Sequence, residues 1–223
     1  MGKDLKLKAS DGFELGAYRA DPAGAPKGAI VVIQEIFGVN HHIRSVCDRL
    51  AAEGYVAIAP SIFDRIQPGF TSGYTPDEIT KARAFIANPD WDAMLRDTQA
   101  AIDAVKGTGP VGIVGFCLGG SIAYAAATKL SGLSAAVGYY GGAVVRFADD
   151  KPKVPTQLHF GEKDAGIPLT DVDAIKAKRP EVEVYVYPGA QHGFSCDERP
   201  SYDKASADIA WPRSMAFFAK HMK

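Results

Sequence analysis

Runs of apolar residues alternate with amphipathic stretches along most of the chain. Residues 29–34, 55–60 and 111–114 are almost entirely apolar, which is typical of strands buried on both faces of a sheet. After the first run, apolar residues recur at intervals of three and four positions, as on one face of a helix. These residues are Ile43, Val46, Cys47, Leu50 and Ala51. Strands that alternate with helices predict an α/β fold with a mainly parallel sheet and helices on both faces.

The rest of the chain continues this alternation. A Ser-Asp-Gly turn separates two strand-like segments near the start, which are expected to pair as a hairpin. The capping box Thr75-Pro76-Asp77-Glu78 predicts a helix that reaches residue 87. A last helix is expected from about residue 201 to the end, bent or restarted at Pro212. The other expected strands are 4–9, 13–18, 135–140, 156–160 and 182–187, and the other helices are 91–105, 118–130 and 170–178.

Length, charge and cysteine usage narrow the class of protein. A chain of 223 residues with 47% hydrophobic content and no repeat or linker predicts a single α/β domain over 1–223. Its 25 basic and 26 acidic side chains give a net charge of −1, without the positive excess expected for nucleic-acid binding. There is no run of eighteen apolar residues and no signal-peptide stretch. Three widely spaced cysteines do not form a disulfide framework. We expect a soluble, cytoplasmic monomer that binds neither nucleic acid nor membrane.

The segment Gly115-Phe116-Cys117-Leu118-Gly119 follows a buried strand and leads into an alanine-rich helix. This is the context of a nucleophile elbow, a strained strand-to-helix turn that exposes one side chain above the sheet. The positive end of the helix favours thiolate over thiol at Cys117. A buried structural cysteine is the alternative, whereas a dinucleotide loop fails because no G-x-G-x-x-G follows the strand. We therefore predict that Cys117 is a nucleophile.

Two later loops supply the partners that such a nucleophile needs. Asp164 follows the strand 156–160 and His192 follows the strand 182–187, so both lie at the sheet edge where the elbow opens. The order nucleophile, acid, histidine is that of α/β hydrolases. Glu162 is a weaker candidate for the acid, and a solvated carboxylate or a surface histidine is the alternative for either residue.

The loop after the strand 29–34 is expected to contribute to an oxyanion hole. In this fold one backbone N–H comes from that loop, here Ile36, and the other from the residue after the nucleophile, here Leu118. Glu35 is unusual at this place, because a buried carboxylate without a partner is costly. Its partner is either the Cys117 thiol or a nearby arginine. Beside the thiol, the Glu35 anion would oppose thiolate formation in the empty site.

Four motifs together resemble the dienelactone hydrolase family. They are Gln-Glu-Ile-Phe-Gly-Val-Asn at 34–40, Gly-Phe-Cys-Leu-Gly-Gly at 115–120, Val-Gly-Tyr-Tyr-Gly at 137–141 and His-Gly-Phe at 192–194. The resemblance extends over nearly the whole chain. It implies an α/β-hydrolase fold, a triad of Cys117, His192 and Asp164, and cleavage of enol lactones such as dienelactone. It also implies that Glu35 interacts with the resting thiol and helps to activate it when substrate binds.

The chain departs from the family where the substrate carboxylate is bound. Dienelactone hydrolases hold that carboxylate with two arginines, one of them four residues after the catalytic histidine, where this chain has Cys196. The nearest replacement is Arg199, and the region of the second arginine offers Lys81 and Arg83. The expected substrate-binding residues are Phe37, Lys81, Arg83, Tyr140 and Arg199. Dienelactone itself therefore stays an open question, whereas hydrolysis of an ester or lactone is predicted.

The other histidines and cysteines are interpreted mainly as structural. His41 and His42 are adjacent on a helix and point apart, so no metal site is expected. Cys47 lies on the apolar face of the same helix, and His159 lies inside a buried strand. Cys196 either lines the pocket or fills space beside the catalytic histidine.

These residues predict an enzyme that cleaves a small ester or enol lactone through an acyl-enzyme, without a metal or other cofactor. The alternative within the same fold is another carboxylesterase or thioesterase. The alternative from a different class is a thiol redox or sensor protein, which would use Cys117 and need Cys196 as its resolving cysteine.

Overall fold

A sheet covered by helices on both faces forms the core of the molecule. In the computed structural model, which describes residues 2–223, the strands are β1 (Lys3–Lys8), β2 (Glu14–Ala20), β3 (Ala29–Ile33), β4 (Val56–Pro60), β5 (Val111–Phe116), β6 (Ala135–Tyr139), β7 (Thr156–Gly161) and β8 (Glu183–Tyr187). The helices are α1 (His41–Ala52), α2 (Pro76–Ala84), α3 (Trp91–Val105), α4 (Leu118–Lys129), α5 (Val144–Phe147), α6 (Leu169–Lys178) and α7 (Lys204–His221), with a short 3-10 helix η1 (Lys106–Thr108).

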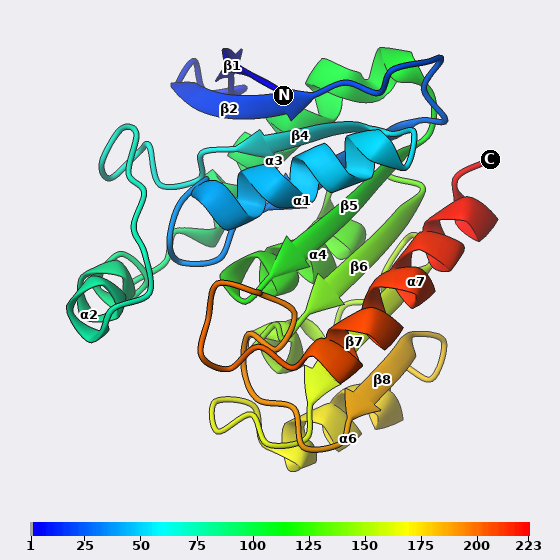
Figure 1. Ribbon diagram of the computed structural model, residues 1–223. Helices are drawn as coiled ribbons and strands as arrows, with labels where there is room; N and C mark the ends of the chain where they lie inside the picture. Colours follow the sequence, from blue (N-terminus) through cyan, green and yellow to red (C-terminus); the bar gives the residue numbers. More distant parts are fainter. Residues whose placement is uncertain (1) are drawn as a thin grey trace.

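The strands lie in the order β1-β2-β4-β3-β5-β6-β7-β8 (Figure 1). The first hairpin is antiparallel, β2 pairs antiparallel with β4, and every later pair in this order is parallel. The expectation of a mainly parallel α/β sheet is confirmed. Among residues 2–223, no helix is both long and apolar enough to cross a membrane.

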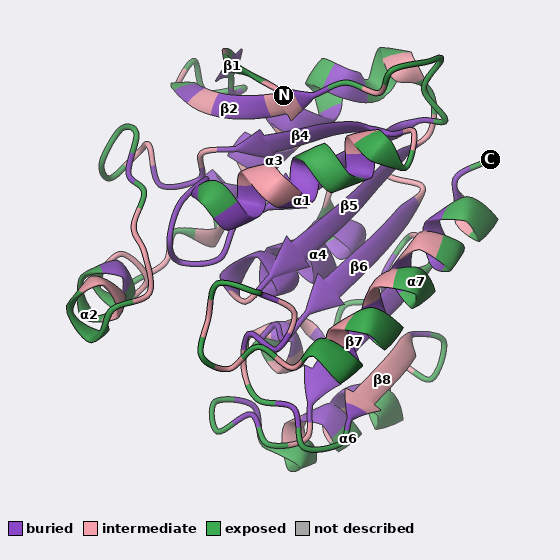
Figure 2. Cartoon of the chain, viewed as in Figure 1, coloured by how far each residue is buried: buried purple, intermediate pink, exposed green. Residues whose placement is uncertain are grey.

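Neighbouring residues of β3 pack on opposite faces of the sheet. Ile30 and Val32 belong to an apolar cluster that includes residues of α1 and α7, which lie in front of the sheet in Figure 1. Val31 and Ile33 belong to a second cluster with residues of α3 and α4, which lie behind it. Figure 2 shows the central strands buried throughout. The apolar runs of the sequence therefore mark strands that are covered on both sides.

Two details of the helices differ from the sequence prediction. Of the two expectations for Pro212, a bend or a restart, the restart is excluded, because α7 runs through Pro212 as one helix that begins at Lys204. A proline removes one helical hydrogen bond, but Ala210 before it and Phe217 and Phe218 after it are buried, and this packing holds the helix on both sides. α2 ends at Ala84 instead of residue 87, whereas its capping box forms as expected. The sequence pattern did not reveal the short helices α5 and η1.

Parallel strands bring the loops that carry chemistry to one edge of the sheet. β3 and β5 are neighbours in register, with Ile33 opposite Gly115 near their carboxyl ends. β7 and β8 are likewise neighbours, with Gly161 opposite Tyr187. The segments that follow these four strands therefore emerge at the same edge, as expected for sites in open α/β sheets.

Candidate active site

Cys117 occupies a strained turn between β5 and α4. Its backbone has φ 55° and ψ −115°, in the left-handed half of the φ/ψ map that residues other than glycine seldom adopt. The flanking glycines make this turn possible: a Cβ at Gly115 would lie 1.8 Å from the carbonyl oxygen of Gly119, and a Cβ at Gly119 would lie 2.3 Å from that of Ile33. The Cys117 N–H donates to the carbonyl of Tyr139 at 3.0 Å. The turn has the geometry predicted for a nucleophile elbow.

His192 is oriented by Asp164. Nδ1 of His192 lies 2.7 Å from Oδ2 of Asp164, whose side chain is fully buried and also accepts the Gly166 N–H at 2.9 Å. Glu162, the weaker candidate, instead accepts the Gly189 N–H at 2.9 Å. The carboxylate of Asp164 therefore fixes Nδ1 of the imidazole and leaves its other nitrogen free to face the thiol.

The charge state of His192 results from two opposing influences. Burial lowers its pKa, but the negative charge of Cys117 and the hydrogen bonds to Asp164 and Cys117 outweigh this effect and raise the pKa to about 10. This balance applies when Cys117 is a thiolate, and the imidazolium that it favours is the form that can donate a proton to a leaving group.

Two cavities meet at Cys117 and His192. The larger has a volume of about 350 Å³, and Leu118 and Arg146 lie in its wall together with the thiol and the imidazole. The smaller has a volume of about 130 Å³. Its lining residues are Ile36, Phe37, Ile79, Ile86 and the arginines Arg83 and Arg199 beside Cys117 and His192. A substrate whose carbonyl lies at the thiol would thus meet both cavities. The larger is lined by apolar and polar residues, and two arginines line the smaller.

Glu35 is paired with an arginine. Its Oε1 accepts a hydrogen bond of 2.9 Å from Nη1 of Arg199, while the Glu35 side chain is 1% exposed. Of the two partners that the sequence left open, the structure gives the arginine. Burial lowers the pKa of Arg199, but the charge of Glu35, followed by smaller contributions that include Cys117, raises it overall. The pair therefore lies within electrostatic reach of the nucleophile.

The guanidinium of Arg199 is enclosed by its neighbours. It lies 5.6 Å from the ring centre of Phe37 and 5.9 Å from that of Tyr74. A Cβ at Gly193 would come within 2.5 Å of Nη1, and Gly193 also has a positive φ of 78°. Glycine at position 193 therefore allows the chain to turn after His192 and leaves room for the guanidinium of Arg199.

Of the predicted residues Arg83, Lys81 and Tyr140, Arg83 alone lines one of the two cavities. Arg83 lies in the wall of the smaller cavity, whereas Lys81 is exposed on α2 with its ammonium 5.9 Å from the Phe70 ring, away from the two cavities described above. Tyr140 is fully buried, and its hydroxyl lies 2.9 Å from Ser195 Oγ. Its ring centre lies 5.1 Å from that of His192. Lys81 and Tyr140 therefore stay predictions as substrate contacts, since Lys81 lines neither cavity and Tyr140 packs against the histidine.

The structural interpretations of Cys47 and His159 agree with their surroundings. Cys47 is buried on α1, and burial raises its pKa. His159 is fully buried, its two ring nitrogens bond to Tyr187 and Gln157 at 2.8 Å each, and burial lowers its pKa to about 3. Sequence reasoning missed Arg146 in the larger cavity, since it lies on α5, which the periodicity does not reveal.

Comparisons with known proteins decide the family. The model of the dienelactone hydrolase family matches residues 15–222. The chain belongs to the dienelactone hydrolase family. A protein of Synechocystis sp. provisionally named carboxymethylenebutenolidase is 37% identical over 95% of this chain and 94% of its own length. The carboxymethylenebutenolidase of Pseudomonas putida is 33% identical, over 98% of this chain and 97% of its own length.

Solved structures agree with this membership. A Klebsiella pneumoniae protein provisionally named a dienelactone hydrolase has 32% sequence identity and a TM-score of 0.86. The alignment covers 98% of this chain and 99% of that protein. Family membership confirms the expected α/β-hydrolase fold and the expected class of enzyme, a hydrolase of ester or lactone bonds.

Proposed function

We propose that this dienelactone hydrolase relative cleaves its ester or lactone substrate with a Cys117-His192-Asp164 triad through an acyl-enzyme. The strained elbow at Cys117, next to a histidine held by a buried aspartate at 2.7 Å, is the observation that carries the proposal. The nucleophile, the histidine and the orienting carboxylate thus stand in the relation that acyl transfer requires.

The proposed reaction has two halves. The thiol proton of Cys117 passes to His192, and the sulfur attacks the carbonyl carbon to give a tetrahedral oxyanion. The N–H groups of Ile36 and Leu118 are proposed to bind this oxyanion, and each such donor contributes about 3–4 kcal/mol in comparable sites. His192 then protonates the departing alkoxide or enolate oxygen, which leaves a thioester on Cys117. Water, deprotonated by His192, attacks this thioester, releases the carboxylic acid and restores the thiol.

The two cavities favour a small substrate with a charged part. Arg83 and Arg199 lie in the wall of the smaller cavity, and the guanidinium of an arginine binds carboxylates in a fork geometry. One donor of Arg199 already serves Glu35, so Arg83 is the arginine with the more accessible charge. We therefore propose a small enol lactone or ester that carries a carboxylate, bound in the smaller cavity with its carbonyl at Cys117.

The acyl-enzyme can be tested by mass spectrometry. Wild-type protein and His192→Gln are mixed with p-nitrophenyl acetate and quenched in acid, and the intact mass is measured. We expect wild type quenched during turnover to carry one acetyl group on Cys117 and His192→Gln to be acylated far more slowly, because the base of both halves is absent, while Cys117→Ala takes up none and loses esterase activity. The matched control Cys47→Ala keeps both activity and acylation. Activity retained in Cys117→Ala would contradict the triad.

The same variants test the redox alternative. A thiol sensor would form a Cys117–Cys196 disulfide after peroxide treatment. Cys196 is a poor resolving thiol, because burial and then the charge of Glu35 raise its pKa to about 12. We expect peroxide to oxidise Cys117 without forming this disulfide, whereas peptide mapping that finds it would favour the sensor.

A further inference from the structure

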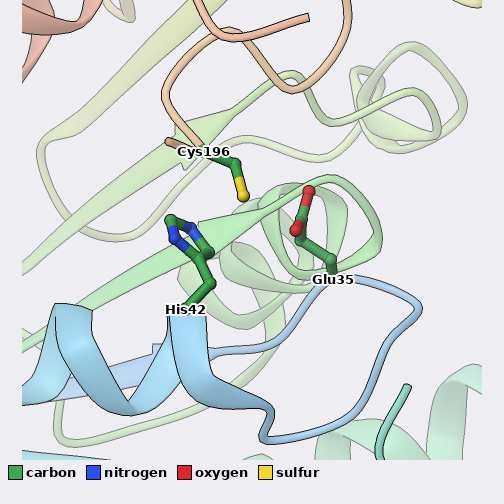
Figure 3. Close-up of side chains that lie close together, drawn as sticks. All are labelled: Glu35, His42 and Cys196. Carbon is green, nitrogen blue, oxygen red and sulfur yellow. The ribbon is translucent and has the colours of Figure 1, made fainter. Parts of the chain in front are cut away.

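Behind the pair of Glu35 and Arg199, three buried side chains meet. Glu35 follows β3, His42 lies in the first turn of α1, and Cys196 lies in the segment that follows β8. Figure 3 shows the carboxylate, the imidazole and the sulfur facing a common space. One ligand atom of each residue lies within 4.8 Å of those of the other two. All three residues are at most 3% exposed.

Two of these side chains have an unsatisfied polar atom. Oε1 of Glu35 is bonded to Arg199, but Oε2 is buried without a hydrogen-bond partner among residues 2–223. In the same part of the chain, Nε2 of His42 is also buried without a partner. Buried polar atoms are nearly always satisfied, and each exception needs an explanation. Two such atoms in one cluster indicate a ligand that binds both.

The donor set is that of a transition-metal ion. Carboxylate oxygen, imidazole nitrogen and thiolate sulfur are the three ligand types that Zn²⁺ takes in proteins, at about 2.0–2.3 Å. A tetrahedral site with these bond lengths has its ligand atoms roughly 3.3–3.8 Å apart. The cluster, within 4.8 Å, can reach this geometry by small side-chain movements. Hard cations such as Mg²⁺ disfavour a sulfur ligand, which leaves the softer ions.

Asp197 lies close to His42. Its Oδ1 is 3.6 Å from Nδ1 of His42, the ring nitrogen opposite the unsatisfied one, which is longer than a hydrogen bond. Metal-bound histidines usually have a carboxylate bonded to the ring nitrogen that does not bind the ion. A small movement of the exposed Asp197 side chain would give His42 this partner.

We propose that Glu35, His42 and Cys196 bind a divalent transition-metal ion of the Zn²⁺ type, with water as the fourth ligand. The thiol of Cys196, which donates to the Tyr74 hydroxyl at 3.3 Å, loses its proton to solvent when the metal–sulfur bond forms. The proposal goes beyond the hydrolytic function, since neither Cys117 nor His192 is a ligand. Glu35 would bind the metal as well as Arg199, so the metal would lie next to the substrate pocket without being part of it.

A separate cavity reaches His42. It has a volume of about 220 Å³, and His42, Ser195 and Asp197 lie in its wall. Trp211 and Pro212 of α7 form another part of the wall, and this cavity shares no lining residue with those at Cys117. It therefore approaches His42 separately from the substrate pocket.

Cobalt binding tests the proposal directly, because Co²⁺ replaces Zn²⁺ and absorbs strongly in the near ultraviolet when a thiolate binds it. The titration uses reduced full-length Cys117→Ser, so that the catalytic thiol cannot contribute, and its result does not depend on the proposed hydrolysis. We expect one equivalent of Co²⁺ with a thiolate-to-metal band, and displacement of the band by Zn²⁺. Adding Cys196→Ser should abolish the band, and adding His42→Gln should weaken binding at least tenfold.

Two further variants make the result specific. His41 is the neighbour of His42 in sequence, and its own side chain is 87% exposed. His41→Gln should therefore leave binding unchanged. Asp197→Asn alters an exposed side chain and should weaken binding about tenfold through His42. If His42→Gln does not fold, Asp197→Asn still tests whether His42 is a ligand. A Cys117→Ser protein without a thiolate band, or a band that survives Cys196→Ser, would overturn the proposal.

Discussion

Glu35→Gln and Arg199→Gln are expected to change the reactivity of Cys117 in opposite directions. The native pair, joined at 2.9 Å, carries no net charge, so its two charges largely cancel at the thiol. Glutamine at position 35 leaves an uncompensated guanidinium, which stabilises the thiolate. Glutamine at position 199 removes that positive charge and leaves a carboxyl group, which does not stabilise it.

The size of the effect follows from the charges. With an effective dielectric constant of about 20, a unit charge at about 10 Å contributes about 1.7 kcal/mol. This corresponds to a change of more than tenfold in the thiolate fraction below the titration midpoint. The charge of Cys117 is among those that raise the pKa of Arg199, and because such coupling is reciprocal, Arg199 favours the thiolate in turn.

Alkylation by iodoacetamide between pH 6 and 9 measures this fraction, since the reagent is neutral and reacts with the thiolate. Metal chelator is present throughout, and peptide mapping confirms that Cys117 carries the label, with the buried Cys47 and Cys196 as internal controls. We expect labelling at pH 6 to be about tenfold faster in Glu35→Gln and slower in Arg199→Gln than in wild type. Glu162→Gln is the matched control, because its carboxylate binds the Gly189 N–H and not the pair.

Two results would refute this reasoning. If both variants shift the rate in the same direction, the effect comes from altered packing and not from charge. If Glu35→Gln stays within twofold of wild type at every pH while its urea unfolding is normal, the pair does not sense the nucleophile. The carboxylate of Glu35 would then only hold Arg199 in place.

Three further predictions concern binding, pH and the turn. Arg83→Gln should raise KM for an anionic lactone about tenfold and leave KM for a neutral ester unchanged, whereas Lys81→Gln, outside the cavity, should change neither. Because folding raises the pKa of His192 from 6.5 to about 10, its proton stabilises the fold fully below pH 6.5, and this contribution is lost as pH rises through 10. The urea midpoint should thus fall more between pH 7 and 10 in wild type than in His192→Gln. Gly119→Ala, whose Cβ would meet a carbonyl oxygen at 2.3 Å, should lower stability by at least about 2 kcal/mol and abolish activity, while Gly24→Ala, with open space around it, should do neither.

The sheet and the loops of the candidate site could be placed from sequence because their signals are local. Each central strand is a short apolar run, and each is followed at once by its loop residue, so parallel pairing alone brings Cys117, Asp164 and His192 to one edge. Neither step required knowledge of side-chain positions. The elbow was equally local, because the two glycines that allow the positive φ flank the cysteine in sequence.

Contacts between loops could not be predicted in this way. Glu35 and Arg199 are 164 positions apart, and the segment that carries Arg199 has no periodicity from which its direction could be inferred. The sequence could not show which of Lys81 and Arg83 lines the pocket for a related reason. Ala82 is the one buried residue within α2, so this helix has too weak an apolar face to show which basic side chain turns toward the pocket.

The position of Glu35 connects the two halves of this site. One of its oxygens holds Arg199 at the substrate cavity, and the carboxylate also lies close to His42 and Cys196. A substrate carboxylate that approached Arg199 would therefore compete with Glu35, whereas Arg83 is exposed and lies in the same cavity wall. On the proposed function, we expect recognition of the substrate charge to belong mainly to Arg83, and Arg199 to act chiefly on Cys117 and on the position of Glu35. The two arginines should accordingly separate in kinetics, with substitution of Arg83 acting on KM and substitution of Arg199 acting mainly on kcat and on thiol reactivity.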